Sequence, residues 1–552
     1  MTANDPASID SSQKPKRKRW RRVVGGSVAF IAMLLFGMFG WLEVIAHRPS
    51  PVHETLTTAQ IDAEDARLKQ FGLTIPDESF LKEHPFDPPW TSHSLLVPAS
   101  WSQQPGIKMF LGSHRVRADL LLSDLDVLEP VMERAYGGWD SAAARGWNWS
   151  QWFADWRKLL AAKGTAELPF DEAFAPMDAL IAFQRDNHTQ IPLNRWWTDD
   201  GSQTAILAGV PDAACGEIRA GGRSFFVDAN DAGRRVRTAK LWKSGTNSFT
   251  DTNYISMPTS YGTPRAVRCG NAWIPLQPVR RKSGLRYLIP DLASRFLKHD
   301  RTRVERLGEG VVYARLPEFS WSNYKDVPRE GWAQRQPGDR VLIVDMRNNG
   351  GGNKEFGLDV LKSWVDERRL VQFESIGTQV SSSCLYAALK WDYPMEDATT
   401  WSPDEKNFLQ GLLDRMALSY PPGCPRTVDT KPPQWTYLQH RFAPKPGDLR
   451  IIALVNSGCG SDCEGLTAQL ASLPETIVIG SNTFGMIQFI QPGYSVLPHA
   501  GLRYRFALGR SNYYGDNRSV DGYGLDVDVV LPEVDTLEPK QMLELGKIVA
   551  KL

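Results

Sequence analysis

Apolar residues recur at helical spacing in the region before residue 190, which predicts three helices. One face of the first helix is formed by Leu121, Leu125, Leu128, Met132 and Ala135. Glycines at 137 and 138 mark its end. Aromatic residues repeat over 147–156, and a third helix is predicted over about 171–184. Together these patterns predict an N-terminal helical subdomain at residues 116–195.

Short apolar runs rich in β-branched residues predict buried strands further along the chain. They cover 311–319, 341–346, 451–455 and 476–480. The last two flank a predicted helix in which Leu466, Leu470 and Leu473 share one face, and Pro474 ends it. This order of strand, loop, helix and strand predicts an α/β core at residues 301–535. Alternating stretches also predict strands at 479–491, 504–510 and 529–531, and a polar helix at 536–552 closes the chain.

Residues 196–300 predict a β-rich insert, because short alternating stretches are broken there by Gly, Asp and Asn. A helix is expected within this region at 289–297, leading into the core. Residues 46–115 are rich in proline and polar residues and predict a linker followed by irregular structure. Residues 372–448 form a long insertion with proline, and no role follows from its composition.

The N-terminus predicts a membrane anchor. Residues 1–22 form a polar and basic tail, and 23–42 contain no charged residue. Twenty helical residues span about 30 Å, the thickness of the bilayer hydrocarbon. We therefore predict one transmembrane signal anchor at 23–45, with the basic tail in the cytoplasm and the remaining chain translocated. Residues 44–46 also fit a cleavage site, so a removable signal peptide is the alternative.

Composition excludes several other functions. The formal net charge of +1 argues against a nucleic-acid binder, and 19 tryptophans indicate a packed globular protein. The six cysteines lack zinc-ribbon spacing, and no HExxH motif occurs. No metal or other cofactor is therefore predicted. Disulfides are compatible with the cysteines, but six cysteines allow 15 pairings and the sequence does not choose among them.

Ser461 lies in the loop between the predicted strand 451–455 and the following helix. Free amides and the positive end of the helix dipole would stabilise an oxyanion there, so a nucleophile is useful at this position. The alternative is a plain helix-capping serine. Cys459 and Cys463 replace the glycines of the Gly-x-Ser-x-Gly elbow, and we interpret them as structural or as a local disulfide.

Two further loops carry candidate chemistry. Gly350, Gly351 and Gly352 follow the strand at 341–346, where glycines let the backbone approach a ligand. A phosphate loop is the rival interpretation, but the Gly-Lys-Ser/Thr signature is missing. His188 follows the third predicted helix in a short polar loop, although a single histidine is more often a surface or core residue than a catalyst.

Three stretches together resemble the tail-specific (C-terminal processing) and tricorn-core family of serine peptidases. They are DNHT at 186–189, VLIVDMRNNGGG at 341–352, and NSGCGSDCE at 456–464 followed by IGSNTFG at 479–485. The resemblance implies a crotonase-like (ClpP/crotonase) α/β catalytic core. Many members use a Ser-Lys dyad, but Met486 stands where that lysine would be, 25 residues after the serine. This departure points to the tricorn-like branch, with histidine as base.

Carried onto this chain, the resemblance implies Ser461 as nucleophile, His188 as general base and Asp521 as the late acid, where the branch more often has Glu. An activated serine needs such a base, and the base needs an orienting group. The oxyanion would be held by backbone N–H groups of Gly351 and Asp462. Asp521 could instead be an ordinary turn residue.

The sequence thus predicts a serine endopeptidase in the cell inner membrane, single-pass, with its catalytic part in the periplasm or extracellular space. Protein or peptide substrates are its expected partners, with contact to the membrane through the N-terminal helix and none to nucleic acid. A non-catalytic protein that binds hydrophobic ligands or peptides on the same fold is the alternative, and an esterase is a third reading.

Overall fold

This computed structural model describes part of the chain. The residues are 115–189, 202–208, 215–226, 236–243, 248–258, 263–279, 301–320, 334–371, 375–376, 438, 442–497, 499–500, 502–511, 513–514 and 519–552. The predicted anchor at 23–45, the tail and most of the linker, the helix at 289–297, and Cys384 and Cys424 lie outside them. Within the described ranges, no helix combines the length and apolar character needed to cross a bilayer.

Helices dominate the first described region, as the sequence predicted. Its elements are β1 (Arg115–Arg117), α5 (Ala118–Ala135), α6 (Trp139–Ala144), α7 (Trp149–Ala161), β2 (Glu167–Pro169), α8 (Phe170–Ala173) and α9 (Ala175–Gln184). Leu121, Leu125 and Leu128 on α5 are fully buried. The helical periodicity of these leucines therefore identified the inner face of α5 correctly.

The third predicted helix, at 171–184, is divided into α8 and α9 by Phe174, and in this detail the prediction was wrong. Phe174 has φ −109° and ψ 11°, which no longer continues α8. Pro176 lies in the first turn of α9. Proline lacks an amide N–H and is tolerated in the first turn of a helix but not in its interior, so a new helix begins here.

Parallel strands form the centre of the catalytic region. In spatial order they are β10 (Arg303–Gly308), β11 (Val311–Arg315), β12 (Val341–Asp345), β14 (Arg450–Val455), β15 (Thr476–Gly480) and β18 (Val529–Val530). Only β10 among these pairs antiparallel to its neighbour. Because parallel strands end at one edge of a sheet, the loops after β12 and β14 lie side by side.

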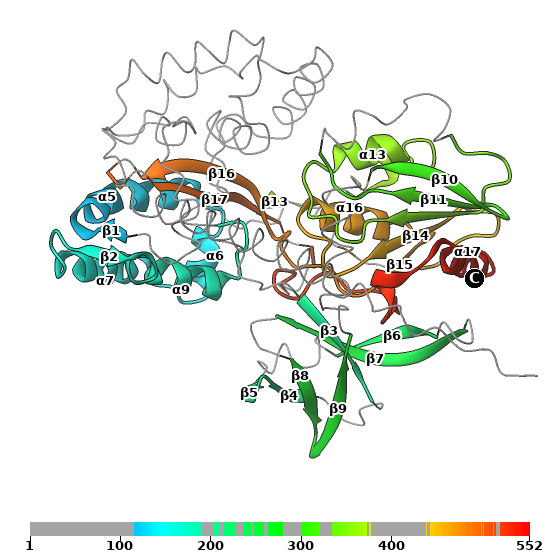
Figure 1. Cartoon of the computed structure of the whole chain (residues 1–552), viewed down its shortest axis with the longest axis horizontal. Coiled ribbons are helices and arrows are strands. Elements are labelled where there is room, and N and C mark those ends of the chain that lie inside the picture. The colour runs from blue at the N-terminus through cyan, green and yellow to red at the C-terminus, as the bar shows by residue number, and fades with distance from the viewer. Residues whose placement is uncertain are drawn as a thin grey trace, which may run out of the picture.

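Helices cover both faces of this sheet (Figure 1). Leu342 and Val344 of β12 pack with α13 (Glu355–Leu361) and α16 (Asp462–Ala471). The alternate residues Val341 and Ile343 pack with α17 (Pro539–Val549) on the other face. Successive side chains of a strand point to opposite faces, so both faces of β12 are buried. The C-terminal helix, predicted as polar, is thus amphipathic. Two 3₁₀ turns, η4 (Glu367–Arg369) and η6 (Val534–Thr536), complete the region.

The predicted β-rich insert is observed. Its strands are β3 (Ser202–Leu207), β4 (Cys215–Ala220), β5 (Arg223–Phe226), β6 (Val236–Lys243), β7 (Ser248–Pro258), β8 (Pro264–Cys269) and β9 (Ala272–Pro278). Strand β6 pairs in parallel with β18. The insert and the catalytic strands therefore form one sheet, which has 13 strands among the described residues. The fold is mixed α/β with a large sheet, and β4 and β8 are joined by a Cys215–Cys269 disulfide.

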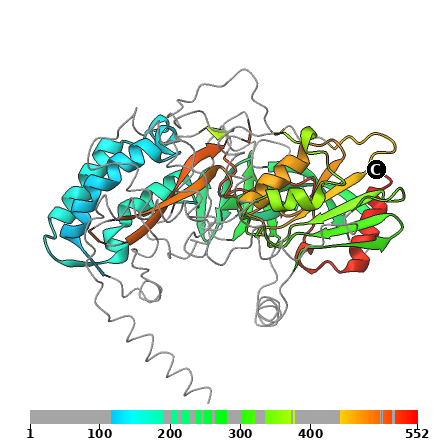
Figure 2. The ribbon, with the colours of Figure 1, turned by 90° about the horizontal axis from the view of Figure 1, so that it is seen from above.

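A long β-hairpin connects the catalytic region with the helices. It consists of β16 (Phe489–Leu497) and β17 (Leu502–Ser511), with β13 (Ser375–Ile376) at its side. Phe489, Tyr504 and Phe506 are buried among residues of α5, α7 and α9. Figures 1 and 2 both show the hairpin, in orange, lying along these helices. The segment assigned by sequence to the 301–535 core thus also supplies part of the core of the helical subdomain.

The predicted strand at 479–491 was wrong in its extent. Strand β15 ends at Gly480 and β16 begins at Phe489, so 481–488 form a loop. The backbone amides of residues 485 to 488 in this loop donate to the carboxylates of Glu464 and Asp521. These donors are therefore unavailable to a strand ladder, which explains the break.

Candidate active site

Ser461 occupies the N-cap of α16 in an unusual backbone conformation. Its φ is 53° and its ψ is −130°. Positive φ is rare for a residue with a side chain and costs on the order of 1–3 kcal/mol, so the surrounding structure must hold it. The Ser461 carbonyl accepts from the amide of Glu464 at 2.8 Å. The sharp turn places the hydroxyl at the carboxyl edge of the parallel strands.

His188 lies directly opposite the serine. Its Nε2 is 3.1 Å from the Oγ of Ser461, although the two residues are 273 positions apart. His188 as a whole is only 4% exposed. This distance is within hydrogen-bond reach, which a general base needs for its nucleophile. The structure thus brings together the predicted nucleophile and the predicted base.

The loop that carries His188 is fixed by Asp186. After α9 ends at Arg185 in a left-handed conformation, φ 59°, the Asp186 carboxylate accepts from the amides of His188 and Thr189 at 2.8 and 3.0 Å. The Thr189 hydroxyl also donates to it. Burial raises the pKa of Asp186 above its usual value, although these hydrogen bonds act to lower it. Asp186 therefore shapes the loop through its backbone contacts.

Gly351 lies against Ser461, but its amide N–H already has an acceptor. A Cβ added at Gly351 would lie 2.7 Å from the Cβ of Ser461, and its φ is 104°. Its N–H donates to the Oδ1 of Asn349 at 2.8 Å. Asn349, fully buried, also donates from Nδ2 to the Leu316 carbonyl. Gly351, the predicted oxyanion donor, thus lies next to Ser461, but its N–H donates to the side chain of Asn349.

Asp462, the second predicted oxyanion donor, is the first residue of α16. Amides in the first turn of a helix have no intrahelical acceptor and lie at the positive end of the dipole. The Asp462 carboxylate accepts from the Lys354 amide at 3.2 Å and lies 3.9 Å from the Lys354 Nζ. This contact ties α16 to the residue that precedes α13.

Asp521 is fully buried, and its hydrogen bonds go to the 481–488 loop. Its Oδ1 accepts from the amides of Ile487 and Gln488, each at 2.8 Å. Its Oδ2 is buried without a hydrogen-bond partner among the described residues. Burial raises the pKa of Asp521 well above its usual value, and the nearby carboxylates of Glu464 and Asp186 add to this. Its assignment as the third catalytic residue stays a prediction.

Sequence reasoning did not single out Glu464, the third residue of α16. Its fully buried carboxylate accepts from the Thr483 hydroxyl and from the amides of Gly485 and Met486, the latter two at 2.8 and 2.7 Å. Burial raises its pKa to about 7. Its position three residues after a helix-capping serine matches a capping box, which was the available signal. Glu464 instead fixes the loop opposite its helix.

That loop also reaches the histidine. The Gly485 carbonyl accepts from the Asn187 side-chain amide at 3.3 Å. Hydrogen bonds therefore run from α16 through Glu464 and Gly485 to the residue that precedes His188. Met486, in the place of the lysine of the Ser-Lys dyad, is 5% exposed. A Cβ added at Gly460 would lie 3.1 Å from its Sδ, so its thioether packs beside the nucleophile loop.

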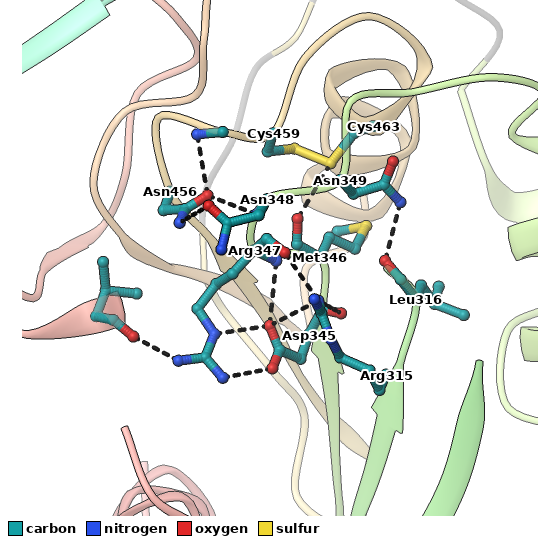
Figure 3. Close-up of polar contacts among 12 residues, drawn as sticks. Arg315, Leu316, Asp345, Met346, Arg347, Asn348, Asn349, Asn456, Cys459 and Cys463 are labelled. Carbon is teal, nitrogen blue, oxygen red and sulfur yellow. Dashed lines mark hydrogen bonds and ion pairs between the residues drawn. A yellow bond between two sulfur atoms is a disulfide. The ribbon is translucent and has the colours of Figure 1, made fainter. Parts of the chain in front are cut away.

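An ion cluster supports the loop after β12 (Figure 3). Arg347 binds Asp345 through Nε and Nη2 at 2.8 and 2.6 Å, and Arg315 lies 3.5 Å from the same carboxylate. Burial alone would raise the pKa of Asp345, but the two arginines outweigh it and lower the value to about 2. The Asn456 side chain then joins this loop to the one after β14 by accepting from the Asn348 amide at 2.8 Å.

Cys459 and Cys463 form a disulfide on either side of Ser461. Figure 3 shows it beside Asn348 and Asn349 of the neighbouring loop. Both cysteines are fully buried. The sequence allowed this local pair as one option, and the structure contains it.

Cavities of about 270 and 1070 Å³ are lined by residues other than Ser461 and His188. In the described part of the chain, no group of three His, Cys, Asp or Glu side chains is arranged to hold a metal ion. The location of the chemistry therefore rests on the contact between the serine and the histidine.

Comparison with known proteins identifies a family for part of the chain. The sequence profile described as peptidase family S41 matches residues 310–531. These residues form a domain of peptidase family S41, a family of serine-type hydrolases, and the resemblance to this family is thereby confirmed. The tricorn-like branch with histidine as base stays a prediction.

Two curated relatives are both named carboxyl-terminal-processing protease. The protein from Synechocystis sp. is 36% identical over 66 residues, and the one from Picosynechococcus sp. is 34% identical over 68 residues. Each match covers 12% of this chain and 16% of the relative. The chain therefore matches only about one sixth of the length of these relatives.

Solved structures are similar at low identity. Mature CPAF has a TM-score of 0.38 at 16% identity, with 79% of this chain and 97% of that chain covered. The photosystem II D1 C-terminal processing protease has a TM-score of 0.30 at 14% identity, with 77% and 93% covered. The tricorn protease has a TM-score of 0.34 at 12% identity, with 79% and 37% covered.

Proposed function

We propose that this chain is a serine endopeptidase in which Ser461 is the nucleophile and His188 the general base. The observation that carries the proposal is the 3.1 Å contact between Nε2 and Oγ. In the first step the imidazole removes the hydroxyl proton while Oγ attacks the peptide carbonyl. The imidazolium then protonates the leaving amine, and a water molecule hydrolyses the acyl-enzyme by the reverse sequence.

The oxyanion would form at the N-terminus of α16. The Asp462 amide supports it there, because the helix dipole favours negative charge. The Gly351 amide contributes once it leaves the Oδ1 of Asn349, its present acceptor. Substrate binding therefore has to change the conformation at Asn349 and Gly351 if both donors act. The family resemblance also leads us to propose a crotonase-like arrangement of the core.

Asp521 is our proposed acid. Its buried Oδ2, without a partner among the described residues, supports this role. Asp521→Asn keeps an oxygen acceptor for the amides of Ile487 and Gln488, so the loop should stay folded. Loss of kcat by about 10³-fold or more would support an acid that stabilises the imidazolium. An unchanged kcat would reduce Asp521 to a residue that holds the loop.

The proposed substrates are proteins or peptides outside the cytoplasm, with the chain anchored in the inner membrane by residues 23–45. The uncharged run in that segment supports an anchor. The disulfides Cys215–Cys269 and Cys459–Cys463 support an oxidising compartment, because disulfides persist there and are rare in the cytosol. Fractionation of cells and protease accessibility of the C-terminal part test this location.

Two variants and one reagent test the reaction. Ser461→Ala and His188→Ala should each abolish peptide hydrolysis and leave the thermal unfolding midpoint within a few degrees. A fluorophosphonate should label the parent protein at Ser461 and leave the Ser461→Ala variant unlabelled. Normal turnover in either variant would refute the assignment. A folded parent protein that neither reacts nor hydrolyses peptides would indicate a binding protein, and ester turnover without peptide cleavage would indicate an esterase.

A further inference from the structure

We infer that the Cys459–Cys463 disulfide holds Ser461 in its reactive backbone conformation, so that hydrolysis requires these two cysteines to be oxidised. The inference rests on the proposed function. The disulfide closes a ring of five residues whose middle member is Ser461. Ser461 is the only residue of this ring with a positive φ.

Both ends of the ring are anchored in rigid structure. Cys463 is the second residue of α16. Cys459 donates its amide to the Asn456 carbonyl at 2.9 Å, and its own carbonyl accepts from the Phe484 amide at 2.8 Å. The disulfide therefore joins the first turn of the helix to a loop that is already fixed against its neighbours. The chain between the two cysteines has little freedom left.

Hydrogen bonds alone hold the remaining part of this turn. The Gly460 amide donates to the Asn349 carbonyl at 3.0 Å, and the Cys463 amide donates to the Gly460 carbonyl at 3.1 Å. With the disulfide open, rotation at Ser461 to a common φ would need only non-covalent contacts to rearrange. These are the two hydrogen bonds above and those from the amides of Glu464 and Gly465 to the Ser461 carbonyl. A disfavoured conformation persists where its surroundings over-determine it, and the disulfide supplies the covalent part of that constraint.

Ring size distinguishes this disulfide from the other one. Cys459 and Cys463 are four positions apart, whereas Cys215 and Cys269 are 54 apart. A disulfide that closes a short loop removes less entropy from the unfolded chain than one that closes a long loop. The Cys459–Cys463 bond is therefore suited to fixing local geometry rather than to stabilising the whole fold.

Reduction would proceed by thiol–disulfide exchange. A thiolate of an added dithiol attacks one sulfur, the other cysteine leaves as a thiolate, and the second thiol of the reagent completes its own oxidation. The products are two cysteine thiols and the cyclic disulfide of the reagent. Both protein sulfurs belong to fully buried residues, so the exchange needs a local opening of the turn and is expected to be slow.

The test compares two double variants of the full chain. In Cys459→Ala/Cys463→Ala, kcat on a fluorogenic peptide should fall roughly 10-fold to 100-fold, because the strained conformation of Ser461 loses its constraint. KM should change little, since the substrate contacts remain. The matched control, Cys215→Ala/Cys269→Ala, removes the disulfide of the insert and should keep its kcat.

Hydrolysis of the fluorogenic peptide is also measured while the disulfides of the unmodified chain are reduced. This experiment avoids any folding defect of a variant. Dithiothreitol is added, and differential alkylation with mass spectrometry reports which cysteines are reduced. Activity should fall in step with reduction of Cys459 and Cys463 and return on reoxidation. Full activity with both thiols free would overturn the inference while leaving the peptidase proposal intact. An inactive oxidised parent protein would overturn both.

Discussion

The Nε2 of His188 lies 3.1 Å from the Oγ of Ser461, and a network of buried carboxylates keeps the two residues in place. Asp186 holds the histidine loop, and Glu464 holds the loop that contacts Asn187. Ser461 and His188, the proposed nucleophile and base, belong to different subdomains. Their alignment therefore depends on the loop at 481–488, which is hydrogen-bonded to both sides.

Gly351→Ala should inactivate the protein. The added Cβ would lie 2.7 Å from the Ser461 Cβ and 2.9 Å from the Gly460 carbonyl oxygen, and φ is 104°. Ser461, the proposed nucleophile, must then move, and such a displacement can lower the rate by about 100-fold. Gly350→Ala is the control, because its Cβ meets no atom within 4 Å. Peptide hydrolysis and fluorophosphonate labelling should separate the two; equal rates would refute the packing argument.

Met486→Leu should leave kcat/KM within about threefold of the parent value. The thioether packs beside Gly460 and has no proton to give or take. A swap that conserves volume in a buried site usually costs less than about 1.5 kcal/mol. Steady-state kinetics on one peptide, with His188→Ala assayed alongside, provide the measurement. A collapse of kcat in the leucine variant would mean that Met486 takes part in the reaction.

Arg347→Ala should lower the free energy of unfolding by about 3–5 kcal/mol, because it leaves the Asp345 carboxylate buried without its closest cation. The bond from Arg347 to the Val534 carbonyl is lost as well. Urea unfolding at neutral pH measures the change. Arg368→Ala is a surface control, since Arg368 is 89% exposed in its pair with Asp366, and its urea midpoint should stay close to that of the parent protein.

Because of Asp345, we also expect the stability of the folded protein to fall in acid. Its pKa is lowered from 3.8 to about 2 in the folded protein, so the unfolded state binds the proton more tightly. The stabilisation is complete above pH 3.8 and is lost as the pH falls through 2. In Asp345→Asn this part of the pH dependence should be absent. Urea titrations between pH 2 and 5 compare the slopes, and identical slopes would contradict the lowered pKa.

For Glu464 we expect the opposite dependence of stability on pH. Burial raises its pKa from 4.5 to about 7, so the folded state binds the proton more tightly than the unfolded state. Its contribution to stability is therefore present below pH 4.5 and is lost as the pH rises through 7, by on the order of 3 kcal/mol. Glu464→Gln should lack this slope. Unfolding free energies measured from pH 4 to 8 test it, and a parallel slope in the variant would be evidence against it.

Local patterns predicted much of this architecture. The apolar runs at 341–346 and 451–455 identified two central strands, because strands buried on both faces are apolar throughout. The spacing of Leu121, Leu125 and Leu128 identified the buried face of α5. Ser461 and His188 were singled out as candidates because each lies in a polar loop beside a regular element, and the structure places them in contact.

Other features depend on contacts that no local pattern encodes. Glu464 looks like an ordinary first-turn residue until the Thr483 to Met486 loop folds against it. The same contact interrupts the strand that alternation had predicted at 479–491. Gly351 lies against Ser461, but its hydrogen bond to Asn349 is a matter of side-chain orientation within one loop. The pairing of the hairpin with α5 depends on long-range packing of Phe489 and Phe506.

Strand β18 is only two residues long, yet it is hydrogen-bonded to β15 on one side and to β6 on the other. The Asn482 amide reaches the Thr204 hydroxyl, and the Ser202 amide reaches the Phe484 carbonyl. The insert is thus hydrogen-bonded to the 481–488 loop, which also contacts α16 and the residue before His188. A displacement of the insert would therefore disturb the contact between Ser461 and His188. The insert is thus a fixed part of the catalytic region and not a module that moves about a hinge.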